Sequence, residues 1–248
     1  MCIITLVYKV SANKPLVVVA NRDEFYERPA MPAYFWQEDK QVIGGKDLEK
    51  MGSWLAIHKN HRFAAVTNYR DFTLNQLGEK SRGFIVNDFI LGNQDSQSFL
   101  EKIKQEGSSY GPMNVIVYDG STMAHYNNVT DSIQEMQPGI HCVTNATLNT
   151  PWPKAERMKQ LVAARYEEES VVDLLEIGKD IEKPTDARLP STGIPIEMER
   201  ELSSIFVKRE DYGTRCTTAL QIDRNGQIDF AEQSYEKGMP SEIVHEKF

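Results

Sequence analysis

The sequence predicts an α+β fold built on antiparallel sheets, and three observations lead to this prediction. Short apolar runs rich in β-branched residues come in pairs, as in "CIITLVYKV" and "PLVVVA" on either side of "SANK". Segments with helical spacing are grouped between such pairs and do not alternate with single strands. No linker rich in Gly, Ser or Pro divides the chain, so residues 1–248 are expected to form a single domain.

The first half of the chain is expected to be mainly strands. Residues 2–20 form the hairpin just described, and residues 21–36 are predicted to be irregular because Pro29 and Pro32 interrupt regular structure. Strand candidates then cover 41–45, 53–59 and 62–69.

Helices and two further hairpins are expected in the rest of the chain. Helical spacing covers 81–91, 96–106, 153–169, about 170–178 and about 195–206, with Pro153 placed in a first turn. Hairpins are expected around Gly120-Ser121 and around Arg224-Asn225-Gly226, and "HCVTNATLNTPWPK" is predicted to be a short strand that ends in a Pro-rich turn.

Composition excludes several classes of function. The net charge of −8 disfavours nucleic acid and anionic membranes as main partners, and no apolar run is long enough to span a bilayer. The N-terminus lacks signal-peptide features, which favours a cytoplasmic location. The three cysteines are far apart, so a disulfide framework is not expected. Metal-ligand spacing is also missing, and His58 and His61 are predicted to lie in a turn between strands.

Cys2 is the first candidate for chemistry. Removal of Met1 would give one residue both a thiol, whose ordinary pKa is about 8.5, and an α-amine, whose ordinary pKa is roughly 7.7–8.0. The amine could then take the thiol proton without a separate histidine. The alternative is a small residue that simply begins a buried strand.

Four polar residues directly follow the apolar run "LVVVA", and they are Asn21, Arg22, Asp23 and Glu24. A hairpin would return this segment to the level of Cys2. There an arginine could hold a thiolate, and a carboxylate could orient the α-ammonium group. The alternative is a strand end that opens into a solvated turn.

Two asparagines and a later arginine complete the candidates. Asn68 and Asn145 each follow an apolar run in the tripeptide Val-Thr-Asn, where an amide could donate to an oxyanion or form an Asx-turn. Arg215 precedes a late strand in "GTRCTTALQID" and could bind substrate or lie on the surface.

Together these segments resemble the NRDE family, which includes the transport and Golgi organization 2 homologs. The resemblance rests on "MCI", "ANRDEFYERPA", "GGKDLEKMGSWLAI", "AAVTNYRD", "SRGFIVNDFI", "TNATLNTPWPKAERMK" and "YGTRCTTALQID". More distantly, the layout is similar to the cysteine branch of the N-terminal-nucleophile hydrolases, with its penicillin V acylases, bile salt hydrolases and acid ceramidase-type amidases. That resemblance implies a four-layer αββα sandwich of two antiparallel sheets.

The same resemblance implies roles for residues. Cys2 would be the nucleophile, Asn68 and Asn145 the oxyanion asparagines, and Arg215 the late arginine. The acylases carry Arg-x-x-Asp after the second strand, and an ungapped alignment puts Asn21 and Glu24 at those positions. We favour Arg22 and Asp23 as catalytic and assign Asn21, Glu24 and Arg215 to substrate binding.

The sequence thus supports two hypotheses. The first is a hydrolase that cleaves a linear amide or related acyl bond of a small molecule through Cys2, with no cofactor or metal. The second, implied by the family resemblance, is a non-catalytic carrier for haem or for lipid and acyl-CoA species. Under the second, the aromatic residues Phe25 and Tyr26 and the run "YFW" at 34–36 would line an apolar pocket, although core packing is the simpler role for them.

Overall fold

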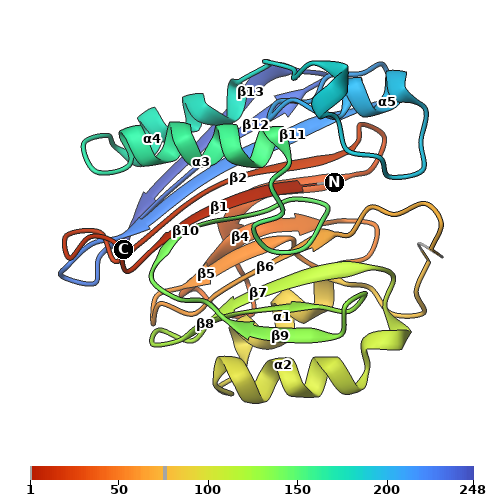
Figure 1. Cartoon of the computed structure of the whole chain (residues 1–248). Coiled ribbons are helices and arrows are strands. Elements are labelled where there is room, and N and C mark those ends of the chain that lie inside the picture. Colours follow the sequence, from red (N-terminus) through yellow and green to blue (C-terminus); the bar gives the residue numbers. More distant parts are fainter. Residues whose placement is uncertain (1, 75–76) are drawn as a thin grey trace. The chain divides into compact units, whose positions relative to one another are not determined.

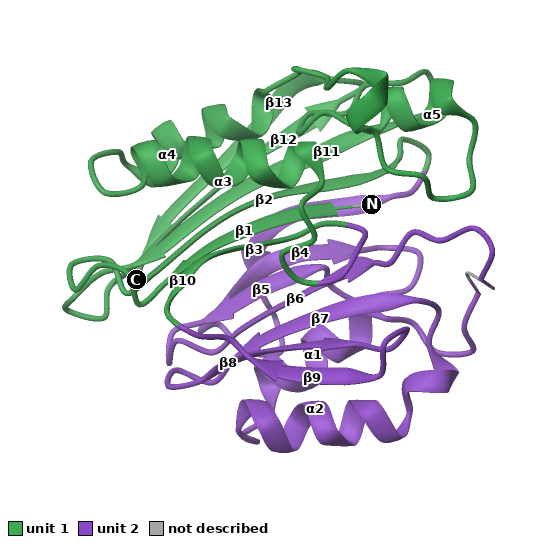
Figure 2. Ribbon diagram, viewed as in Figure 1, with its two compact units in different colours: residues 1–27, 138–144, 148–248 green, residues 28–137, 145–147 purple. Residues whose placement is uncertain are grey.

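The computed structural model describes residues 2–74 and 77–248. The chain folds into two compact units (Figure 2). Unit 1 comprises residues 1–27, 138–144 and 148–248, and unit 2 comprises residues 28–137 and 145–147. The short segment 145–147 therefore belongs to a different unit from the residues on either side of it.

Unit 1 contains an antiparallel sheet (Figure 1), whose order among the described residues is β10-β1-β2-β11-β12-β13. These strands are β1 (Cys2–Tyr8), β2 (Leu16–Phe25), β10 (Gly139–Val143), β11 (Tyr212–Ile222), β12 (Ile228–Glu236) and β13 (Met239–Lys247). β1 and β2 contain the β-branched runs seen in the sequence, which suit a pleated, buried surface.

Helices pack against one face of this sheet. They are α3 (Pro153–Arg165), α4 (Val171–Leu174) and the 3₁₀ turn η2 (Leu175–Lys179). The 3₁₀ turn η3 (Asp186–Arg188) and α5 (Ile196–Glu201) follow along the chain. Alternate strand residues such as Ile3, Val17 and Val19 form a buried cluster with Met158 and Val162 of α3. Because side chains alternate between the two faces along a strand, the odd-numbered residues of β1 and β2 point to this helix-covered face.

Unit 2 contains a second antiparallel sheet, in which neighbouring strands follow one another along the chain. The strands are β3 (Ala30–Phe35), β4 (Val42–Asp47), β5 (Leu55–His58), β6 (Phe63–Asn68), β7 (Met113–Tyr118), β8 (Met123–Asn127) and β9 (Ser132–Glu135). Its helices are α1 (Gly83–Leu91) and α2 (Ser96–Gln105), followed by the 3₁₀ turn η1 (Gly107–Ser109).

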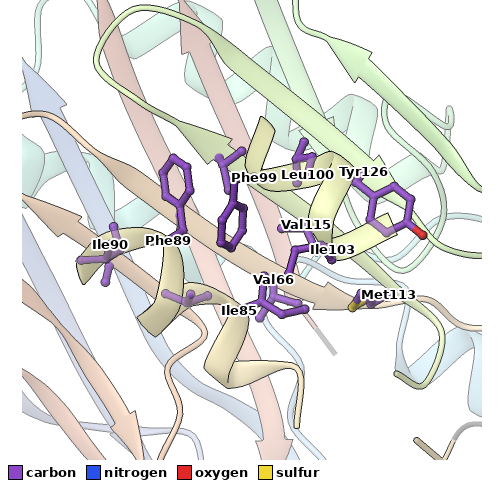
Figure 3. Packing of buried hydrophobic residues seen from close by; sticks show 14 of the residues in the cluster. Val66, Ile85, Phe89, Ile90, Phe99, Leu100, Ile103, Met113, Val115 and Tyr126 are labelled. Atoms are coloured by element: carbon purple, nitrogen blue, oxygen red, sulfur yellow. The ribbon is translucent and has the colours of Figure 1, made fainter. Parts of the chain in front are cut away.

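A hydrophobic cluster joins the helices of unit 2 to its sheet. Figure 3 shows Phe89 of α1 and Phe99 of α2 among side chains from β6, β7 and β8. The rings of these two phenylalanines meet edge to face with centroids 4.9 Å apart. Trp36 is fully buried in the same cluster and Tyr34 packs against it, so both residues have the core-packing role considered for "YFW".

The fold class is therefore α+β with two antiparallel sheets, each with its own helices, as predicted. The hairpins around Gly120-Ser121 and Arg224-Asn225-Gly226 are confirmed, and so is the turn that contains His58 and His61. The predicted helices are present but shorter, and the segment near 170–178 divides into α4 and η2. The strands β9 and β13 were not predicted. The single-domain assignment stays a prediction.

One prediction is wrong: residues 21–36 are not irregular. β2 continues through Phe25 because its polar residues pair along β11, from Asn21 opposite Thr217 to Phe25 opposite Tyr212. β3 tolerates Pro32 because it is an edge strand and its pairing with β4 shifts at that point. Among the described residues, no helix is both long and apolar enough to cross a membrane.

Candidate active site

Cys2 begins β1 and lies in one row with the side chains of Arg22 and Cys216. The register of unit 1 places Cys2 opposite Arg22 on β2, and Arg22 opposite Cys216 on β11. Directly opposed residues of antiparallel strands point to the same face of a sheet, so this row lies on the face away from the helices. The structure thus brings Cys2 and Arg22 together, as the hairpin argument predicts.

Opposing effects set the acidity of the Cys2 thiol. Burial raises its pKa, and the nearby Asp23 carboxylate raises it further. The Arg22 guanidinium and a backbone N–H of Asp23 lower the pKa, because both stabilise a thiolate. Burial is the largest of these effects, so the thiol needs a base to become nucleophilic.

Asp23 is buried and held by neighbours that the sequence analysis did not identify. Thr214 donates its hydroxyl to Asp23 Oδ1 at 2.8 Å, and Tyr212 donates to the Asp23 backbone carbonyl at 2.8 Å. Burial raises the pKa of Asp23, while the Lys154 ammonium group lowers it. Lys154 is itself buried in the first turn of α3 and donates to the Leu202 carbonyl at 3.1 Å.

Asn21 occupies the helix-covered face, next to the row but on its other side. Its Nδ2 donates to the carbonyls of Gly178 and Ile205 at 2.8 and 3.0 Å. Its Oδ1 accepts from the Thr217 hydroxyl at 2.7 Å. These bonds tie η2 and the segment before β11 to the sheet. Asn21 therefore has a structural role here, and its assignment to substrate binding stays a prediction.

Arg215 and Glu24 lie near Arg22, at an irregularity of the sheet. The register of β11 against β2 shifts between Thr214 and Cys216, which leaves Arg215 in the bulge. Arg215 donates to the Phe25 carbonyl at 2.8 Å. Burial and the positive charge of Arg22 lower the pKa of Arg215, and Glu24 opposes this change. The structure therefore gathers these predicted residues at one end of β2.

A further carboxylate extends this polar region. Glu232 on β12 is buried and accepts from the Thr218 hydroxyl at 2.9 Å. It also interacts with Cys216, whose pKa burial raises well above its ordinary value. Sequence reasoning predicted the hairpin that pairs β11 with β12, but it did not single out Glu232 as a partner of the residues around Arg22. Arg22 lies beside both thiols and lowers the pKa of each, but Glu232 raises the pKa of Cys216 further.

Asn68 and Asn145 form a separate constellation in unit 2. Asn145 is fully buried, and its Nδ2 donates to the Asn68 backbone carbonyl at 2.8 Å. Arg70 returns a backbone N–H to the Asn145 carbonyl at 2.7 Å. Within the described ranges, Asn145 Oδ1 is buried without a hydrogen-bond partner. This oxygen could accept a hydrogen bond from a ligand, whereas an oxyanion would need an N–H of the Asn145 Nδ2 group.

The described residues contain no group of three or more His, Cys, Asp or Glu side chains that could hold a metal ion. The Cys2 row consists of a thiol, a guanidinium group and a second thiol. This donor set suits acyl chemistry on sulfur better than metal binding, because arginine is not a metal ligand and repels cations.

Comparisons with known proteins identify relatives over nearly the whole chain. The model of the family Transport and Golgi organisation 2 matches residues 1–237. The chain is 33% identical to the human and to the bovine Transport and Golgi organization protein 2 homolog, covering 94% of this chain and 93% of each relative. It is 26% identical to the Drosophila melanogaster Transport and Golgi organization protein 2, covering 88% of this chain and 86% of that protein.

Solved structures with a similar layout are more distant. A C2A mutant of conjugated bile acid hydrolase from Clostridium perfringens has a TM-score of 0.44 and 10% identity, covering 100% of this chain and 97% of that one. A Caenorhabditis elegans ortholog of N-acylethanolamine-hydrolyzing acid amidase has a TM-score of 0.48 and 9% identity, covering 88% of this chain and 92% of that one.

Proposed function

We propose a function for this chain from one premise: the chain belongs to the Transport and Golgi organisation 2 family. We infer that it is a hydrolase that cleaves a linear amide or related acyl bond of a small molecule in the cytoplasm. Cys2, made N-terminal by removal of Met1, is the nucleophile. The observation that carries this proposal is the pairing of Cys2 with the buried Arg22 in one row of the unit 1 sheet.

The reaction proceeds in two balanced stages. The Cys2 α-amine takes the thiol proton, and the sulfur attacks the acyl carbon to form a tetrahedral oxyanion. The C–N bond then breaks, and the α-ammonium group gives its proton to the leaving amine. Water attacks the resulting thioester, again with the amine as base, and releases a carboxylic acid and the thiol.

Arg22 and Asp23 have complementary tasks in this reaction. Arg22 stabilises the thiolate, as its effect on the Cys2 pKa indicates. Asp23 orients the α-ammonium group, and Lys154 favours the charged form of Asp23 that this task requires. Thr214 and Tyr212 fix Asp23 through their hydrogen bonds. Asn68 and Asn145 are the sequence-predicted oxyanion donors.

Intact-mass analysis with a panel of acyl substrates, N-acyl amides and activated thioesters of different chain lengths, tests the proposal. We expect an acyl adduct on the processed protein that maps to the N-terminal peptide and decays with product release. Cys2→Ala should form no adduct and lose turnover. Cys216→Ala is the matched control, because it removes the other thiol of the row, and it should retain adduct formation.

The carrier hypothesis makes a different prediction in the same material. A protein that only binds haem would show a saturable Soret shift at micromolar haem, with no acyl adduct from any substrate. That result, together with turnover unchanged in Cys2→Ala, would reject the hydrolase.

A further inference from the structure

We propose that Asn114 is a positioning residue that holds the Asn145 segment in place for the reaction. This inference rests on the proposed function, because it concerns an asparagine predicted to bind the oxyanion. Asn114 lies on β7, in a row with Thr67 on β6 and Asn127 on β8. Its polar side chain is buried, so its amide group needs hydrogen-bond partners within the protein.

All four hydrogen-bonding positions of the Asn114 amide are filled. Its Nδ2 donates to Thr67 Oγ1 at 3.1 Å and to the Ala146 carbonyl at 2.9 Å. Its Oδ1 lies 2.9 Å from His125 Nε2 and accepts from Asn127 Nδ2 at 2.9 Å. An amide offers two donors and two acceptor positions, so no rotation of Asn114 retains this set of bonds.

His125 contributes as a neutral donor. Burial lowers its pKa to about 4, so the ring is uncharged near neutral pH. Asn114 Oδ1 can only accept, and the facing His125 Nε2 must therefore carry the proton. This fixes the tautomer of His125, and it leaves the Asn114 Nδ2 group aimed at Ala146.

The bond to Ala146 distinguishes this network from ordinary sheet pairing. Residues 145–147 are the short segment of unit 2 that comes from beyond residue 137. Two bonds join it to the end of β6, from Arg70 N–H to the Asn145 carbonyl and from Asn145 Nδ2 to the Asn68 carbonyl. Asn114 adds a third bond, and it comes from a side chain on β7, outside the two Val-Thr-Asn segments.

Loss of the Asn114 donor has a specific consequence. The Ala146 carbonyl would lose its side-chain partner, and the peptide next to Asn145 could rotate. A donor that stabilises an oxyanion must be held within a few tenths of an ångström, because its value comes from being preorganised. Asn114 therefore acts through Asn145 and does not touch the substrate.

Asn114→Asp tests this inference. The aspartate keeps an acceptor for His125 and Asn127, and these two donors favour its ionised form, which repels the Ala146 carbonyl. Asn128→Asp is the matched control. Like Asn114, Asn128 donates its side-chain amide to backbone carbonyl oxygens, in this case those of Gly107, Tyr110 and Gly111. Its Oδ1 accepts from the Met113 backbone N–H, and none of these bonds involves residues 145–147.

Two measurements are made on each purified full-length variant. The first is hydrogen exchange of the Arg70 backbone N–H, which donates to the Asn145 carbonyl and so measures how firmly residues 145–147 are held, without any substrate. The second is the maximal rate of Cys2 acylation and the substrate concentration that gives half of it. We expect Asn114→Asp to speed Arg70 exchange at least tenfold and to lower the maximal acylation rate at least tenfold, with the half-saturating concentration unchanged. Asn128→Asp should change neither.

A double-mutant cycle shows whether Asn114 acts through Asn145. In an Asn145→Ala background, Asn114→Asp should cause no further loss of acylation rate. Asn114→Leu removes both Nδ2 donors without introducing a charge. It is used in place of Asn114→Asp if the aspartate variant does not fold.

The outcomes separate the two proposals. Wild-type protein that forms no acyl adduct overturns the proposed function, and Arg70 exchange then still judges whether Asn114 holds the segment. Acylation that is intact in both Asn114 variants, or lowered equally by Asn128→Asp, overturns the positioning role while the hydrolase stands.

Discussion

At Cys2, several groups act on the acidity of the thiol, and burial has the largest effect. Burial disfavours the thiolate, and the Arg22 guanidinium favours it. The same sheet contains Cys216 one strand further on, where burial raises the thiol pKa well above its ordinary value. The two thiols lie on either side of one arginine, and in the proposed mechanism only Cys2 has a base of its own, the α-amine that removal of Met1 would expose.

Replacement of Arg22 should slow alkylation of Cys2. In Arg22→Gln the thiolate loses its nearby positive charge, so the Cys2 pKa rises further and the rate below that pKa falls about tenfold for each unit of increase. The measurement is the pH profile of Cys2 carbamidomethylation, followed by peptide mass. Arg22→Lys keeps a charge and should lie closer to wild type. A profile for Arg22→Gln that overlays wild type would contradict this role.

The sequence predicted that Cys2 and Arg22 lie together, but it did not predict which residues surround Asp23. Cys2 and Arg22 lie in adjoining segments that a hairpin must bring together, so their pairing could be inferred. Thr214, Tyr212 and Lys154 reach Asp23 from segments that are distant along the chain. Threonine and tyrosine carry no charge pattern that marks them as partners of a carboxylate, and the lysine resembles a first-turn surface residue.

At the scale of elements, β2 organises unit 1 because it continues past its apolar run. Polar residues in this extension form hydrogen bonds with neighbouring segments. Asn21 bonds to Gly178, Ile205 and Thr217, and Asp23 bonds to Thr214. Sequence pattern alone predicted that the strand would end at Ala20. Local propensity depends on neighbouring residues in the sequence, so it does not include the pairing with β11 that extends the strand.

Gly178→Ala should destabilise the protein through this contact. A Cβ atom at Gly178 would lie 2.3 Å from Thr217 Cγ2 and 2.6 Å from Asn21 Oδ1, so η2 would have to move away from the sheet. Overpacking of this kind costs about 1–3 kcal/mol. Urea unfolding measures the loss, with Lys179→Ala as the control, since the half-buried Lys179 side chain pairs with the nearby Glu176 on η2. Equal stability of the two variants would show that η2 does not pack this closely.

At the scale of the whole molecule, the chain forms two units, and each unit is built from segments that are not continuous in the sequence. Each unit has one antiparallel sheet and its own helices, and this class could be predicted because hairpin signals and helical spacing are local. The assignment of residues 145–147 to unit 2 could not, because it depends on bonds from Asn114 and Asn68 that no periodicity reveals.

Acid should destabilise the protein partly through His125. Burial lowers its pKa to about 4 from an ordinary 6.5, so between these values the unfolded chain binds more protons than the folded one. Stability contributed by neutral His125 is therefore complete above pH 6.5 and is lost as the pH falls towards 4, by about 3 kcal/mol in total. Urea unfolding at pH 7 and pH 4.5 should show a smaller loss for His125→Gln than for wild type. Equal losses would contradict this.

The N-terminal mass of the protein purified from its native host tests the central claim most directly. The proposed mechanism requires Cys2 to carry a primary α-amine, since an amide nitrogen cannot accept the thiol proton. We predict an N-terminal peptide that begins at Cys2 and gains an acyl group when the protein is trapped during turnover. An N-terminal peptide that retains Met1, with an unmodified Cys2 under the same conditions, would contradict the account.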